Sequence, residues 1–246
     1  PALLLKAIKT VRPTVILSVP LIIEKIYKGS VLQTINGSRT LRWMDKHANR
    51  LTCKIIGMKL KSTFGGHLTF FGVGGAKMDP EVESFLLKAG FPYAVGYGLT
   101  ETSPLVAYSL KRWRCVGSIG YPVYNVKMKL ADVNPETGEG EIVVKGPNVM
   151  LGYYKDPKRT KSVFTEDGWF RTNDLAVIDG KGRFFIKGRK NNMILGSSGE
   201  NIYPEEIESV INNQDGVTES IVVERNGRRV PLVQPCDGCI DWTDAS

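Results

Sequence analysis

One stretch of the chain, HLTFFGVGGAKMDPEVESFLLKAGFPYAVGYGLTE at residues 67–101, limits the possible folds more than any other. Residues 67–73 form an apolar, aromatic-rich run of strand length, and residues 92–95 form a second short one. The amphipathic segment between them predicts a helix that begins after Asp79 and ends at Gly90. Because strand–helix–strand connections are right-handed, the two strands are expected to lie parallel in one sheet.

The limits of this helix follow from local chemistry. Asp79 suits the N-cap, Pro80 suits the first helical position, and Gly90 is a typical C-terminal stop. One face of the helix carries the apolar side chains of Val82, Phe85, Leu86 and Ala89. This face is expected to pack against the sheet.

Two unusual loops follow the two predicted strands. The first contains Gly74, Gly75 and Ala76, and the second runs from Tyr97 to Glu101. Both leave the carboxyl edge of a parallel sheet, which is where sheets of this kind bind ligands. We therefore expect the two loops to line one cleft.

The rest of the chain divides by texture. Residues 15–19 predict a buried strand, and residues 39–51 an amphipathic helix. From Cys115 onward, short alternating segments with glycine-rich turns indicate a small antiparallel barrel or sandwich. A helix is expected at residues 204–212, followed by a hairpin that turns at Asn226-Gly227.

The expected fold class is therefore α/β, in three parts. Residues 1–114 would form part of a doubly wound parallel sheet, and residues 115–188 a small antiparallel β-barrel. Residues 189–246 would begin a small α+β C-terminal domain, with GRKNN as the junction before it.

Charge and composition restrict the partners. The formal net charge is +8, but the basic residues are distributed along the whole 246-residue chain, and acidic residues lie near them. No segment matches a recognition helix, a zinc finger or an RNA-recognition signature, so nucleic acid is disfavoured as a partner. The charge indicates anionic ligands or an anionic membrane surface.

No apolar run reaches the length of a membrane span, and the start, PALLLKAIKT, has neither an initiator Met nor a signal peptide. We expect a piece of a longer protein.

The cysteines are few and irregularly spaced, which fits a reducing compartment and a cytoplasmic location. The CDGC sequence near the end has redox or metal spacing, but a zinc site needs a second ligand pair and only two histidines exist. We assign no metal to it. The four cysteines are Cys53, Cys115, Cys236 and Cys239.

Five motifs occur in an order that resembles the adenylate-forming superfamily, and within it the long-chain fatty acyl-CoA synthetases. They are GGA, YGLTETSP, GEGEIVVKGPNVMLGYYKDPKRT, GWFRTNDLA and GRKNNMILGSSGENIYPEEIE, and the resemblance covers roughly residues 13–234. Members of this family join a carboxylate to ATP, release pyrophosphate, and transfer the acyl group from AMP to coenzyme A. The resemblance implies fatty acid, ATP, Mg²⁺ and coenzyme A as ligands.

The resemblance also implies roles for the first two loops. Tyr97 would stack on the purine, with Gly98 leaving room for it, and Gly74–Ala76 would approach the adenine and the acyl carbon. Glu101 would meet the Mg²⁺ that bridges the ATP phosphates, and Thr100 would contact a phosphate or acyl oxygen. Without the other motifs, a tight turn with a packed tyrosine would explain the same residues.

The later motifs carry further implied roles. Asp174 matches the acid that binds both ribose hydroxyls, and Asn173 before it stands where the family usually has Gly. Arg189 matches the arginine that contacts ribose or phosphate, and Asn191 falls at the family's hinge. Gly199 lies in the loop that matches the lining of the pantetheine tunnel. A charged turn between strands is the alternative for Arg189 and Asn191.

Two parts of the family pattern are not in this sequence. The Ser/Thr/Gly-rich phosphate loop with its lysine would lie upstream, and the adenylation lysine downstream. The chain alone is therefore expected to be inactive. The alternatives are another ligase of the superfamily, such as an aryl-CoA or medium-chain ligase, a fatty acyl-AMP ligase or a peptide-synthetase domain, and a non-catalytic adenylate-binding module. The sequence does not specify acyl chain length or oligomeric state, and peripheral contact of the longer protein with the inner face of a membrane is an expectation that rests on charge alone.

Overall fold

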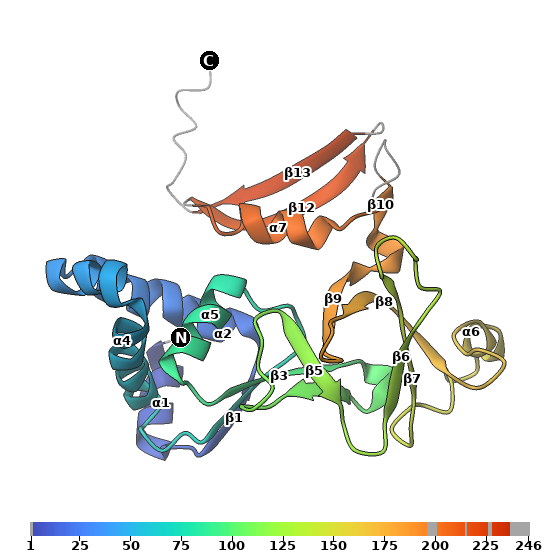
Figure 1. The fold of residues 1–246 in the computed structure, drawn as a ribbon, viewed down its shortest axis with the longest axis horizontal. Coiled ribbons are helices and arrows are strands. Elements are labelled where there is room, and N and C mark those ends of the chain that lie inside the picture. The colour runs from blue at the N-terminus through green and yellow to red at the C-terminus, as the bar shows by residue number, and fades with distance from the viewer. Residues whose placement is uncertain (1, 196–200, 215, 226–227, 237–246) are drawn as a thin grey trace. The chain divides into compact units, whose positions relative to one another are not determined.

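The computed structural model describes the chain except residues 1, 196–200, 215, 226–227 and 237–246 (Figure 1). It divides into two compact units. The first contains residues 1–128, 144–170 and 178–185, and the second contains residues 129–143, 171–177 and 186–246.

The strands form a nine-stranded mixed sheet in the order β1-β2-β3-β4-β5-β9-β8-β7-β6. The pairs β1–β2 and β2–β3 are parallel, as the strand–helix–strand pattern predicted, and β3–β4, β4–β5 and β5–β9 are antiparallel. The α/β class is confirmed. Among the described residues the later strands continue this sheet and do not close into a barrel. The strands are β1 Val15–Ser18, β2 Phe70–Val73, β3 Tyr93–Gly98, β4 Leu105–Ser109, β5 Ser118–Pro122, β6 Lys127–Ala131, β7 Gly140–Lys145, β8 Phe170–Ile178 and β9 Phe184–Arg189.

Helices α1, α2, α4 and α5 of the first unit lie beside its parallel strands (Figure 1). The expected amphipathic helix is longer than predicted, because α4 continues to Thr63 and has a non-helical residue, Ala48, inside it. None of the helices in the described part of the chain combines the length and the apolar character needed to cross a bilayer. The helical segments are α1 Ala2–Val11, α2 Pro20–Ile26, the π-helix Tyr27–Leu32, α3 Gln33–Asn36, α4 Arg39–Thr63, α5 Pro80–Ala89, the 3₁₀ turn Thr100–Thr102 and α6 Pro157–Ser162.

Helix α5 has the limits that the sequence predicted. The Asp79 carboxylate accepts hydrogen bonds from the backbone N–H groups of Glu81 at 2.7 Å and Val82 at 3.2 Å, which caps the helix. Gly90 ends it with φ of 68°, a left-handed conformation that glycine adopts without strain. The buried side chains of Val82, Phe85 and Leu86 attach the helix to the core.

The core of the first unit is rich in aromatic residues. Phe64, Phe71 and Phe91 pack with ring centroids 5.4 to 5.8 Å apart, and each is 2% exposed or less. The prediction that β1 is buried is wrong. Val15 and Leu17 are 55% and 78% exposed, because β1 is an edge strand whose outward face is uncovered in the described chain.

The second unit contains α7, Pro204–Ile211, and the antiparallel pair β12, Val217–Arg225, and β13, Arg228–Pro235. The helix packs on β12, and the Glu208 carboxylate accepts a hydrogen bond from the Val222 N–H at 2.8 Å. The helix and the strand pair confirm the elements predicted from the sequence, although the turn at Asn226-Gly227 lies outside the described residues. The unit also contains the 3₁₀ turn Lys190–Asn192 and the short pair β10, Ile194–Leu195, and β11, Asn201–Ile202. The division of the chain at residues 114 and 188 stays a prediction.

Candidate functional site

The two predicted loops leave the same edge of the sheet. Strands β2 and β3 are parallel, with Val73 opposite Val95, so the residues after Val73 and after Gly98 emerge at the carboxyl edge. The first loop begins against the strand that leads into the second, because a Cβ on Gly74 would lie 3.2 Å from the carbonyl oxygen of Gly96 in β3. Gly75 has a φ of 89°, which a residue with a side chain would adopt only with strain. This part of the expected arrangement is confirmed.

The turn after β3 is held by hydrogen bonds within the turn, made by the Thr102 hydroxyl. The Thr102 hydroxyl donates to the Pro104 carbonyl oxygen at 2.6 Å and accepts from the Leu99 N–H at 3.0 Å. A Cβ on Gly98 would overlap that same carbonyl oxygen of Pro104. Gly98 is therefore required by the turn itself, before any ligand is considered.

Glu101 lies in this turn and is fixed from a distant part of the chain. The Tyr153 hydroxyl donates a hydrogen bond to Glu101 Oε1 at 2.9 Å, and the Met150 N–H donates to the Glu101 carbonyl oxygen at 2.8 Å. The Arg159 guanidinium lies over the Tyr153 ring, 4.2 Å from its centroid. Burial, together with the neighbouring Glu101 carboxylate, raises the pKa of Tyr153, so its phenol stays protonated and donates.

The Glu101 carboxylate suits a single-ligand magnesium site. Its side chain is half-buried, and its second oxygen, Oε2, accepts no hydrogen bond from a described residue. Within the described part of the chain there is no group of three or more acidic, histidine or cysteine side chains able to hold a metal. Mg²⁺ commonly uses one or two carboxylates together with substrate phosphates, so a lone Glu101 fits it. Thr100 is exposed beside it.

Tyr97 is less accessible than its sequence context suggested. The residue is only 8% exposed and pairs with Ala107 of β4. The sequence suggested an aromatic ring displayed by a loop, but the ring belongs to the end of β3 and to the interior of the unit. Its stacking on a purine therefore stays a prediction.

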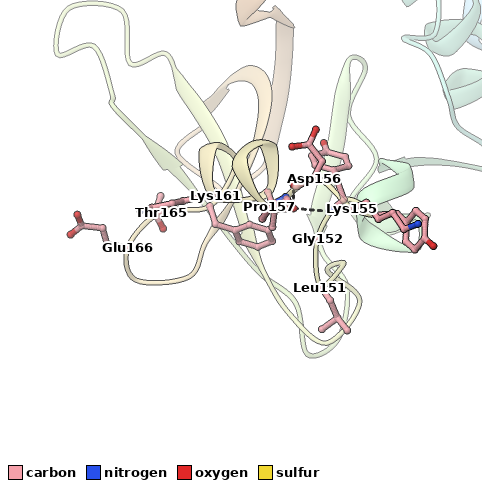
Figure 2. A pocket seen from close by; sticks show the side chains of 12 residues that line it. Leu151, Gly152, Lys155, Asp156, Pro157, Lys161, Thr165 and Glu166 are labelled. Atoms are coloured by element: carbon pink, nitrogen blue, oxygen red, sulfur yellow. Dashed lines mark hydrogen bonds between the residues drawn. The ribbon is translucent and has the colours of Figure 1, made fainter.

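A pocket of about 860 Å³ adjoins Tyr153 (Figure 2). Its walls are the loop that begins at Leu151, helix α6, and the segment that ends at Glu166. The Leu151 side chain is fully exposed. Because Tyr153 also lines this pocket, the residue that holds Glu101 borders open space.

The second unit brings together Asp174 and Arg189, which were predicted separately. Arg189 Nε lies 2.9 Å from Asp174 Oδ1; the aspartate side chain is 7% exposed and the arginine side chain 49%. Asn173, which precedes the aspartate, has a φ of 64°. It therefore occupies the left-handed conformation for which the family's usual glycine is suited, and which Asn also tolerates.

Glu141 of β7 binds the chain neighbours of both members of this pair, Asn173 and Lys190, and was not identified from the sequence. Its Oε2 accepts from Arg171 Nη1 at 2.6 Å and from Lys190 Nζ at 3.1 Å, and its Oε1 accepts from the Asn173 N–H at 3.1 Å. Glu141 is 4% exposed, and the three strand residues that follow it, Ile142 to Val144, are apolar and buried. A charged residue in the run EIVV is the signal that would have pointed to it.

Asn191 and Gly199 of this unit were also assigned roles from the sequence. Asn191 is exposed, as a hinge position requires, and its neighbour Asn192 donates to Glu205 Oε1 at 3.0 Å, which links the turn to α7. Gly199 lies outside the described residues. The roles assigned to these positions stay predictions.

Comparison with known protein families decides the membership. The model of the AMP-binding enzyme family matches residues 1–154. The chain belongs to this family. Its parallel strands, both loops and Glu101 lie inside the matched region, and solved structures of the adenylate-forming fold resemble the chain along most of its length.

Individual relatives are consistent with this membership. The chain is 34% identical over 231 residues to long chain acyl-CoA synthetase 6, peroxisomal, of Arabidopsis thaliana, covering 84% of the chain and 33% of the relative. It is 39% identical over 156 residues to a feruloyl-CoA synthase of an Amycolatopsis species, covering 61% and 31%. The ATP-bound crystal structure of MatB from Rhodopseudomonas palustris matches with a TM-score of 0.71 at 29% identity, covering 97% of the chain and 43% of that structure.

The chain spans only 27% to 39% of the curated relatives that match it across most of its own length.

Proposed function

We propose that this chain supplies part of the adenylate-binding site of an ATP-dependent long-chain fatty acid–CoA ligase. In a protein that also carries the remaining family segments, the reaction would form an acyl-adenylate and then pass the acyl group to coenzyme A. Relatives named as long-chain acyl-CoA synthetases, at 30% and 34% identity, support this substrate class. Contact with a membrane surface is an additional proposal that the net charge favours.

The observation that carries the proposal is the preformed position of Glu101. The carboxylate sits at the carboxyl edge of the parallel strands, its turn is closed by Thr102, and one of its oxygens is held by Tyr153. A fixed carboxylate with a second oxygen left to accept a ligand suits Mg²⁺. Bound there, Mg²⁺ would neutralise negative charge on the ATP phosphates.

The remaining residues would bind and orient. Gly74–Ala76 would let backbone approach the nucleotide, and Tyr97 and Gly98 would border the purine. Asp174 would accept hydrogen bonds from the ribose hydroxyls, and Arg189 would move from the aspartate to phosphate or ribose oxygens. Holding the reactants in one geometry is the main contribution that such residues make to rate.

The same proposal assigns the later segment to movement and to the thiol substrate. Thr100 would contact a phosphate or acyl oxygen near Glu101. Asn191 would be the hinge of a mobile C-terminal domain, and the loop containing Gly199 would line the path of the pantetheine arm. These roles rest on the matched motifs alone.

An aromatic acid is a second candidate substrate. The feruloyl-CoA synthase relative has a higher identity, 39%, than the long-chain synthetases, although over a shorter stretch. A non-catalytic module that binds adenylate is the candidate from another functional class. Acid-dependent exchange of pyrophosphate into ATP separates all three.

The experiment measures that exchange with Mg²⁺ and either palmitate or ferulate. This chain alone is expected to show weak AMP binding, with a Kd of about 1 mM, and no useful exchange. A longer protein that contains the chain and both family lysines should exchange with palmitate. Preference for ferulate would move the assignment to an aryl-CoA ligase. Absence of exchange with any acid in that longer protein would support the non-catalytic module.

A further inference from the structure

A second pocket lies at the amino edge of strands β2 and β3, opposite the edge that carries Gly74–Ala76 and Glu101. It has a volume of about 400 Å³ and is formed by residues at the beginnings of β2 and β3 and by the segment that follows β4. Because β2 and β3 are parallel, the residues that precede them lie at the amino edge of the sheet. Gly74–Ala76 and Glu101 lie at the carboxyl edge, so this pocket is separate from the candidate adenylate site.

Three cationic side chains line this pocket, which we call the basic hollow. They are Lys111, Arg112 and Arg114, and no Asp or Glu is among the described residues that form its walls. Lys111 and Arg112 are exposed, and neither forms an ion pair with a described residue. Concave surfaces lined by one sign of charge attract counter-ions strongly.

Arg114 is held in place with a donor left over. Its Nη1 donates to the Phe91 carbonyl oxygen at 2.7 Å, and its guanidinium lies over the Tyr93 ring, 4.5 Å from the centroid. Its Nε is buried and has no hydrogen-bond partner among the described residues. Buried donors are nearly always paired in folded proteins, so this Nε is a donor that the described residues leave without an acceptor.

The charges near the basic hollow balance a dianion. The buried carboxylate of Glu83 accepts hydrogen bonds from the Tyr93 hydroxyl at 3.2 Å and the Gly117 N–H at 2.7 Å, and it interacts electrostatically with Arg114. This one negative charge offsets one of the three cations. Two positive charges, those of Lys111 and Arg112, remain.

An aromatic side chain completes the site. Trp113 lines the basic hollow, is 39% exposed, and is held by an edge-to-face contact with Tyr121, with ring centroids 5.3 Å apart. Its ring offers a fixed apolar surface beside the cations, which a ring or an alkyl portion of a ligand could contact.

We propose that the basic hollow binds the phosphate group of a phosphorylated ligand, with Trp113 contacting the ligand's apolar portion. Arginine and lysine together are suited to phosphate, which takes several donors and carries two negative charges. The phosphate comes either from a soluble phosphorylated metabolite or from a phospholipid headgroup. The proposal does not depend on the adenylate site, which lies at the other edge of the strands.

The test measures binding of pyrophosphate by calorimetry, in EDTA so that no Mg²⁺ site contributes. K111Q/R112Q removes the two unpaired cations from the exposed rim of the basic hollow. K54Q/K59Q, on the exposed face of α4, removes the same charge elsewhere and is the matched control. We expect saturable binding to the wild-type chain, at least about tenfold weaker binding to K111Q/R112Q, and unchanged binding to the control.

Arg114→Lys tests the geometry separately from the charge. It keeps the cation but removes Nε, so pyrophosphate affinity should fall although the net charge is unchanged. If circular dichroism shows that this variant does not fold, the comparison of the two double variants still decides.

A flotation assay with phosphatidic acid in phosphatidylcholine vesicles identifies the source of the phosphate. Vesicle binding lost only in K111Q/R112Q would indicate a lipid headgroup, and pyrophosphate binding without vesicle binding would indicate a soluble ligand. Either result supports the site. Absence of saturable binding to the wild-type chain, or equal loss in both double variants, would overturn it.

Discussion

Neutralising Glu141 should loosen the segments around the Asp174–Arg189 pair, for which we propose ribose binding, without removing a contact of either member. The Glu141 carboxylate accepts from two cations and from one backbone N–H. In Glu141→Gln, the amide oxygen can accept from one side only, and the NH₂ group then faces donors on the other side.

The magnitude follows from the bonds that are lost. A hydrogen bond to a charged group contributes about 1.5–3 kcal/mol, and two such bonds are at stake. Arg171 and Lys190 are 31% and 44% exposed, so water replaces part of what they lose, and Arg171 keeps its pairing with Asp132 at 2.9 Å. We therefore expect the unfolding free energy of the second unit to fall by about 2–3 kcal/mol.

The assay combines urea unfolding with hydrogen exchange. For an m-value of about 1–3 kcal/mol per molar urea, the midpoint of the second unit should fall by roughly 1–3 M. Exchange should accelerate in peptides covering residues 170–178, where Asn173 donates to Glu141. Glu136→Gln, in an exposed turn, is the matched control. If both variants unfold at the same urea concentration and exchange alike, the assigned role of Glu141 is wrong.

Three further changes test other parts of the chain. Because burial raises the pKa of Glu83, the folded chain keeps this proton to a higher pH than the unfolded chain does. Stability should therefore decline as pH rises from 4.5 through the folded-state pKa, above which the carboxylate is ionised; Glu83→Gln should flatten this decline in pH-dependent urea unfolding, and an unchanged slope would refute the assignment. Gly98→Ala should lower the unfolding free energy by about 1–3 kcal/mol, because the added Cβ overlaps the Pro104 carbonyl. Gly29→Ala is the control, since no atom lies within 4 Å of its added Cβ, and equal melting temperatures of the two variants would contradict this prediction. In a longer protein that contains this chain, Tyr153→Phe should weaken Mg²⁺-ATP binding by about 10- to 100-fold in calorimetry, because Glu101 loses its orienting donor, and unchanged affinity would count against that role.

The sequence predicted those parts of the fold that depend on residues close together in the chain. Helix α5 was predicted with its limits because Asp79, Pro80 and Gly90 act within a few residues of the chain. The parallel β2–β3 pair followed from the handedness of a single crossover. The strands after Ser118 were expected to form a barrel, because their pairing partners, such as β9 beside β5, lie more than 60 residues away and no local pattern specifies them.

The candidate site shows the same limit. The motifs pointed to Glu101 and Asp174, but not to the side chains that hold them. Tyr153 is 52 residues from Glu101, and its neighbour Tyr154 looks equivalent in sequence although it is 88% exposed. The pairing of Arg189 with Asp174 also went unpredicted, since each had been assigned to a ligand.

The turn closed by Thr102 has a thermodynamic consequence. Since its hydrogen bonds and the glycine contact with Pro104 are complete without a ligand, binding would not need to order this backbone. A loop that folds around its ligand loses conformational entropy at that moment, and affinity falls accordingly. Ligand association at this edge should therefore carry only a small entropic penalty from the turn. Any large unfavourable entropy measured on nucleotide binding would then originate in other segments, such as those that follow Arg189.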